Sequence, residues 1–231
     1  MEIRVFRDGK LNPVFQQDAE QPPSPDELND LDDLPSWAEL SCHQCPKCPL
    51  STDEYRWCPA AAAMVPCAKA AADWNSVEEV TLETANANRR ISETMTAANA
   101  LSAIFSSQIV RSNCPAIQLD FWLWKYFSQT ISLENTLFRK LVSNLIYSEL
   151  SRRKGYDIRP IRTTEEELME ILLHLHMRIH ESERILGDAV PNAIVKLHGL
   201  SQYSEHFFDT VYEQLEKNLA ENKTSKEEPI P

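Results

Sequence analysis

The sequence predicts a mainly α-helical protein with a small β element, a cysteine-rich loop of the metal-binding type and a C-terminal helical hairpin. Three observations support this class. Proline and capping residues mark several helix starts. Apolar residues recur at three- and four-residue steps in the C-terminal third, whereas strand-like alternation is confined to short segments. A chain of 231 residues is also long enough to bury a core.

The pattern along the chain divides it into five segments. A short β hairpin around the Asp8-Gly9 turn signal comes first. An acidic linker follows, because eight acids and no lysine or arginine lie between Leu11 and Pro46, together with several prolines. A cysteine-containing core, a helical hairpin and a polar disordered tail complete the chain. The expected boundaries are 1–15, 16–35, 36–158, 159–220 and 221–231.

Proline also marks helix starts inside the core. Pro59 opens an alanine-rich run and places Cys58 at the N-cap of a helix. Cys114 is followed by proline in the same way, so a second helix start is expected there. A strand is expected over 76–84 and a helix capped by Ser92 over 93–110.

Further helices are expected towards the C-terminus. The aromatic run over 121–127 is interpreted as core, and Ser132 caps a helix that ends in a basic trio. A capping box of Thr163 and Glu166 begins a helix that ends at Gly187. Pro191 begins its antiparallel partner, which completes the hairpin.

Charge and composition limit the functions that the sequence allows. The formal net charge of −12 argues against binding to nucleic acid or to anionic lipid. Neither a secretory signal nor a membrane span is expected, so a cytoplasmic location with reduced thiols is predicted. With only four glycines, the chain lacks a phosphate-binding loop and a dinucleotide fingerprint.

The clearest chemistry lies in the cysteines. Four of the six are followed directly by proline, and a Cys-Pro-x-Cys turn directs two sulfurs to one point. The predicted metal ligands are Cys45, Cys48, Cys58 and Cys114. Cys42 is the substitute ligand and His43 a weaker one, while Cys67 is interpreted as a small buried residue. The alternative is that all these thiols are inert and that each proline merely starts a helix.

Two metals suit such a set of thiolates. Zinc fits the Cys-Pro-Lys-Cys turn and is favoured slightly, whereas a 4Fe–4S cluster fits the repeated Cys-Pro step. A second metal set on His176 and His180 is disfavoured, because no acid lies between the two histidines as in the zincin motif. They are interpreted as a flank of the helical hairpin.

The ordered cysteines resemble those of a bacterial family of uncharacterised proteins. That family carries Cys-x-x-Cys-x-Leu, then Cys-Pro-x-Ala and later Ser-Gly-Cys-Pro, and the similarity covers residues 36–155. The resemblance implies Cys45, Cys48, Cys58 and Cys114 as the metal ligands and argues against Cys42 as one of them. This chain departs from the family pattern over 120–125, where an Arg-Phe-His-Leu-Pro-like stretch is expected. The family implies no activity.

The sequence therefore predicts a cytoplasmic, non-enzymatic metal-binding module that engages another protein. The alternative is an iron–sulfur protein in redox sensing or electron transfer. A thiol-dependent enzyme is the weaker alternative, with Cys58 or Cys114 at a helix N-terminus as the nucleophile.

Overall fold

The fold was analysed in a computed structural model, which describes residues 2–12, 23–85, 90–117, 161–181 and 187–199. Several expectations from the sequence fall outside these residues. They are residues 13–15 of the expected hairpin segment, the aromatic run, the helix that follows Ser132, the second half of the last hairpin helix and the polar tail.

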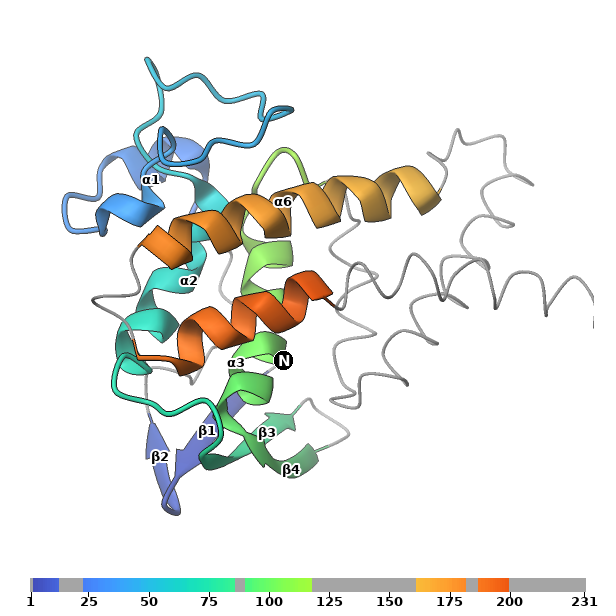
Figure 1. The fold of residues 1–231 in the computed structure, drawn as a ribbon. Coiled ribbons are helices and arrows are strands. Elements are labelled where there is room, and N and C mark those ends of the chain that lie inside the picture. The colour runs from blue at the N-terminus through green and yellow to red at the C-terminus, as the bar shows by residue number, and fades with distance from the viewer. Residues whose placement is uncertain (1, 13–22, 86–89, 118–160, 182–186, 200–231) are drawn as a thin grey trace, which may run out of the picture.

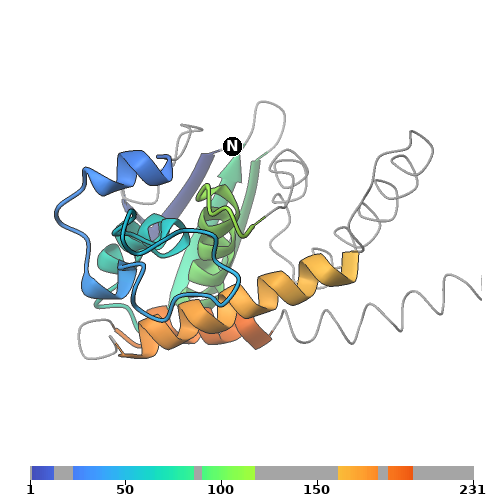
Figure 2. The same ribbon diagram turned by 90° about the horizontal axis from the view of Figure 1, so that it is seen from above.

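The described residues form three layers. The first is a four-stranded antiparallel sheet with the order β2-β1-β3-β4. The second consists of α2 (Pro59–Ala70) and α3 (Ala97–Arg111), which pack on each other, and α3 also packs on the sheet. The third contains α6 (Ile161–Glu181) and a helix over residues 189–199, on the side of α2 and α3 away from the sheet (Figures 1 and 2).

The sheet joins the N-terminal hairpin to two strands far along the chain. β1 (Glu2–Arg7) turns into β2 (Lys10–Asn12) at Asp8 and Gly9, which both have positive φ angles, of 52° and 71°. This is the turn geometry that an Asp-Gly pair favours in a hairpin. β1 then pairs with β3 (Glu79–Ala85), which pairs in turn with β4 (Arg90–Thr96).

The expectation of a mainly α fold is wrong. The described residues combine helices with a four-stranded antiparallel sheet, so helix is not the dominant element of the fold. One cause is the segment around Ser92, which was expected to cap a helix. Ser92 instead lies in β4 opposite Glu83, and α3 begins only after Thr96. Pairing with β3 overrides the local helix signal there.

The N-terminal part of α2 follows the sequence closely. Cys58 is its N-cap and Pro59 its first residue, as predicted. Pro59 suits this position because the first backbone N–H groups of a helix have no acceptor within the helix. Pro66 also lies inside α2. Ala60, Ala61 and Ala62, which follow Pro59, are buried, so this side of α2 packs closely against its neighbours.

Part of the segment that was expected to be a linker is folded. A short helix, α1 (Pro25–Asn29), begins with a capping box in which the Glu27 carboxylate accepts from the Ser24 backbone and hydroxyl. Leu28 is buried, and the following 3₁₀ turn η2 (Ser36–Ala38) buries Trp37. The indole of Trp57 donates to the Leu31 carbonyl at 2.9 Å, which ties this segment to the core.

The C-terminal helices do not begin where the capping signals suggest. α6 already starts at Ile161, before Thr163, and ends at Glu181. The next helix begins at residue 189, two residues before Pro191. Side-chain hydrogen bonds attach it to α3: the Ser102 hydroxyl donates to the Ala193 carbonyl at 2.7 Å, and the Lys196 ammonium donates to the Asn99 side chain at 2.6 Å. Just before the helix, the Asp188 carboxylate accepts from Ser76.

Gly187 lies close to the backbone of the segment that follows α2. A Cβ atom placed there would be 2.5 Å from the Ala72 carbonyl oxygen and 2.9 Å from that of Trp74. We therefore expect Gly187→Ala to lower the free energy of unfolding by about 1–3 kcal/mol, because backbone atoms must move. Urea unfolding measures this. Gly199→Ala is the matched control, since nothing lies within 4 Å there, and an equal loss in both variants would contradict the expectation.

Candidate metal centre

The cysteine loop, defined here as residues 41–57, is closed by backbone contacts at its two ends. Leu40 donates to the Arg56 carbonyl at 2.7 Å and Cys58 donates to the Ala38 carbonyl at 2.9 Å. Glu39 and Trp57 form a β-bridge between these two bonds. The loop therefore leaves the core and returns to it at one place, directly before α2.

Three of the four predicted ligands lie in or next to this loop. The backbone N–H of Cys48 donates to the Cys45 carbonyl at 2.9 Å, which closes the Cys-Pro-Lys-Cys turn. Cys45 and Cys48 are partly buried and pack against the core. Cys58 is buried at the N-cap of α2, and its side chain makes no capping hydrogen bond. Its thiol is thus not used to cap α2.

The fourth predicted ligand, Cys114, follows the end of α3. Asn113 has a φ of 56°, a left-handed conformation that asparagine tolerates at a helix end, and it turns the chain sharply. Cys114 is buried, and its thiol accepts a hydrogen bond from the backbone N–H of Ala116. The expected helix start at Pro115 is a turn in the described residues, closed by Ile117 donating to the Cys114 carbonyl.

The four thiols lie near enough to influence one another. The pKa of Cys114 is raised to about 12, first by burial and then by the charges of Cys58, Cys45 and Cys48. Burial likewise raises the pKa of Cys45 to about 12, with Cys58 as the next cause. Both views show the turn after α3 beside the cysteine loop (Figures 1 and 2). Among the described residues, however, no three of these sulfurs lie within 4.8 Å of one another.

A buried arginine on α6 holds the start of the cysteine loop. Arg178 is 1% exposed, and its guanidinium donates to four backbone carbonyls at 2.5–3.3 Å. These carbonyls belong to Trp37, Glu39, Leu40 and His43. Its positive charge lowers the pKa values of Cys42 and Cys45 and so opposes the effect of burial. No local sequence pattern identified Arg178 as important.

The substitute ligands face α6. The Cys42 sulfur, a ring nitrogen of His43 and a carboxylate oxygen of Glu181 all lie within 4.8 Å of one another. His43 Nε2 is 2.7 Å from Glu181 Oε1. Glu181 was not recognised from the sequence, because it is separated from His43 by most of the chain.

Cys67 lies in α2, within the core. It is 0% exposed, and the Gln108 amide donates to its sulfur at 2.8 Å. Burial raises its pKa to about 12. Cys67 is therefore buried, as the sequence predicted, and its hydrogen-bond partner is an amide.

Three histidines of the C-terminal helices lie near one another. The ring of His176 is 6.1 Å from that of His180 and 6.1 Å from that of His198, measured between centroids. His176 and His180 share one side of α6 and His198 lies on the neighbouring helix.

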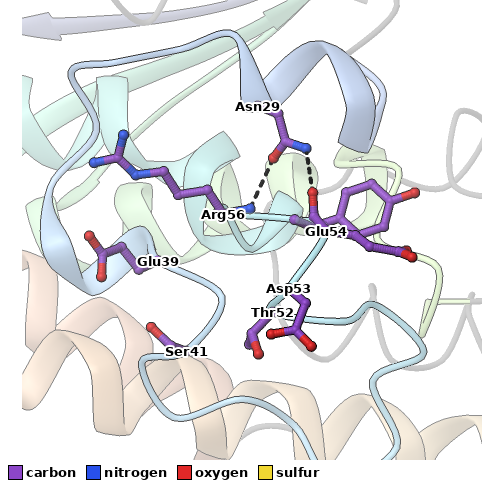
Figure 3. A pocket seen from close by; sticks show the side chains of 8 residues that line it. Asn29, Glu39, Ser41, Thr52, Asp53, Glu54 and Arg56 are labelled. Carbon is purple, nitrogen blue, oxygen red and sulfur yellow. Dashed lines mark hydrogen bonds between the residues drawn. The ribbon is translucent and has the colours of Figure 1, made fainter.

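A shallow polar pocket of about 420 Å³ lies between α1 and the return of the cysteine loop (Figure 3). Asn29 bridges its wall, donating to the Glu54 carbonyl and accepting from the Arg56 backbone, both at 2.9 Å. Its other lining residues are Glu39, Ser41, Thr52, Asp53 and Tyr55. The pocket contains none of the cysteines, so it is separate from the predicted metal ligands.

The described residues thus define an α+β protein in which a cysteine loop and the turn after α3 bring four buried or half-buried thiols into one region. None of the described helices combines the length and the apolar character that crossing a bilayer requires.

The chain belongs to the family described as domain of unknown function DUF6901, which matches residues 21–220. Comparison with the curated proteins and with the solved structures gave no match. The resemblance to an uncharacterised family is thus confirmed at the level of the domain family, while its cysteine pattern stays a prediction.

Proposed function

We propose that the protein is a cytoplasmic metal-binding module in which Cys45, Cys48, Cys58 and Cys114 hold one metal. The observation that carries this proposal is that Cys114, from one stretch of chain, lies near enough to Cys45, Cys48 and Cys58, from a distant stretch, for their charges to raise its pKa. Proximity alone does little to stabilise a group of buried thiols that binds no metal. Thiolates from separate segments, in contrast, are common ligands of structural metal sites. The family-like cysteine pattern supports the same quartet.

Zinc is the first candidate for the bound metal. Sulfurs at about 2.3 Å from a tetrahedral zinc ion lie about 3.8 Å from one another, so the thiols must move closer together when zinc binds. The second candidate is a 4Fe–4S cluster, which is wider than a single ion and so requires less approach of the sulfurs, no three of which lie within 4.8 Å of one another. The hydrogen bond from Ala116 to the Cys114 sulfur suits either, because such bonds stabilise a thiolate.

The proposed role is structural and non-enzymatic, with another protein as partner. The metal would join the cysteine loop to the end of α3 and so support the surface formed by the helices next to it. Leu173 and Met177 on α6 and Val195 on the adjacent helix are exposed apolar residues, which is consistent with a protein-binding surface.

Elemental analysis of protein purified without oxygen tests the proposal. We expect either one tightly held zinc ion, or iron and sulfide with broad absorption near about 400 nm. Cys114→Ser is expected to lose this metal, and Cys67→Ser, the matched control, to retain it. Full metal content in Cys114→Ser would reject the quartet, and loss of the metal in Cys42→Ser would then identify the substitute ligand. Protein without any tightly held metal would reject the proposal as a whole.

A further inference from the structure

We propose a second, solvent-accessible site for a divalent metal, formed by the Cys42 thiolate, the His43 imidazole and the Glu181 carboxylate. Their three ligand atoms already lie within 4.8 Å of one another. Ligands at 2.0–2.3 Å from a tetrahedral zinc ion lie about 3.3–3.8 Å apart, so only small side-chain movements are needed. This site does not depend on the cysteine quartet, since it shares none of that set's four ligands.

Both sides of the site are held in place. His43 has a φ of 44°, and its carbonyl accepts from Arg178 at 3.3 Å and lies 3.1 Å from Nδ1 of His174. Residues 174, 178 and 181 follow at steps of four and three, so they share one face of α6. The face that anchors the loop backbone therefore also supplies the carboxylate, which fixes Glu181 relative to His43.

The three donors suit zinc or a similar ion. A thiolate, an imidazole and a carboxylate are all established zinc ligands, and hard cations such as Mg²⁺ do not favour the sulfur. The side chains of His43 and Glu181 are 26% and 63% exposed, so water has access to the fourth position of a tetrahedral ion. A site with three protein ligands and one water is the arrangement in which zinc lowers the pKa of that water.

A simpler explanation of the same contact is an ion pair between His43 and Glu181, at 2.7 Å. An ion pair does not require a sulfur beside it. Two properties distinguish the explanations: a metal site binds added Co²⁺ or Zn²⁺ and is stabilised by it, whereas an ion pair does neither.

Titration with CoCl₂ under anaerobic conditions, of full-length protein that retains its purified metal, tests the proposal. Wild-type protein is expected to bind one additional Co²⁺ with a thiolate-to-cobalt absorption band. Glu181→Gln, which keeps the size of the side chain, is expected to weaken this binding by at least about tenfold to a hundredfold. His43→Asn is expected to do the same, because asparagine tolerates the left-handed backbone but lacks the imidazole. Glu79→Gln, an exposed change in the distant β3, is the matched control.

The outcomes separate this site from the quartet. The second site is supported if Glu181→Gln keeps the metal present after purification but no longer binds additional Co²⁺, and if Zn²⁺ raises the melting temperature of the wild type and of Glu79→Gln but not of Glu181→Gln. Binding of Co²⁺ with the same affinity by wild type and Glu181→Gln would overturn it, as would the absence of additional binding. Loss of the purified metal in Cys42→Ser, with retention in Cys114→Ser, would assign Cys42 to the other site and also overturn it.

Discussion

Arg178→Met is expected to lower the free energy of unfolding by about 3–5 kcal/mol. Hydrogen bonds to charged groups contribute about 1.5–3 kcal/mol each, and buried carbonyls that lose their donor keep the cost of desolvation. One guanidinium serves four carbonyls here, so the separate contributions are not additive. Methionine fills a similar volume, which limits the part of the loss that comes from a cavity.

Urea unfolding of matched variants measures this effect. Lys69→Met makes the same kind of change at an exposed position, where the ammonium donates to the Asp33 carbonyl at 3.3 Å, and it is expected to cost less than about 1 kcal/mol. Arg178→Lys should fall between them, because an ammonium keeps the charge but lacks the planar fork. A loss below about 1 kcal/mol in Arg178→Met would show that the hydrogen bonds of Arg178 to the four carbonyls contribute little to stability.

If the cysteine quartet holds a metal as proposed, its removal is expected to lower the melting temperature by about 10 °C. Cys45 and Cys114 are 69 positions apart in the sequence, and a cross-link that closes a loop of this length stabilises a fold by about 4 kcal/mol in the chain-entropy model. For a protein of this size, each kcal/mol corresponds to about 2–4 °C. Calorimetry before and after dialysis against a chelator measures the change, and an unchanged melting temperature would contradict it.

The metal-free protein should also respond to alkaline pH in a defined direction. Burial raises the pKa of Cys45 and of Cys114 from the ordinary 9.0 to about 12. The folded state thus retains these protons where the unfolded chain has lost them, so stability is full below about pH 9 and falls as the pH rises towards 12. Metal binding has the opposite dependence, because it requires thiolates. Urea unfolding at pH 7 and pH 10, with chelator present, checks the sign.

Features that depend on neighbouring residues could be predicted from the sequence. Pro59 identified the start of α2, and with it the N-cap position of Cys58. The Asp8-Gly9 turn identified the hairpin, because its backbone geometry requires positive φ angles. The capping box at Ser24 follows the same local rules, but the acidic, proline-rich composition around it was given more weight.

Features that depend on distant residues were missed. Pairing with β3 converts the segment around Ser92 into a strand, although its local pattern suggests a helix. Arg178 lies in a helix that also carries exposed residues, and nothing near it in the sequence indicates that four carbonyls more than 130 positions away surround it. The contact of His43 with Glu181 was missed for the same reason.

The hydrogen bonds from Arg178 to the carbonyls of residues 37–43 affect the order in which parts of the protein can fold during synthesis. The carbonyls of residues 37–43 leave the ribosome long before Arg178 does, because 135–141 positions separate them. Until α6 arrives, this stretch of backbone must satisfy its acceptors with water. The cysteines beside it are therefore exposed to metal donors and oxidants until α6 has been synthesised.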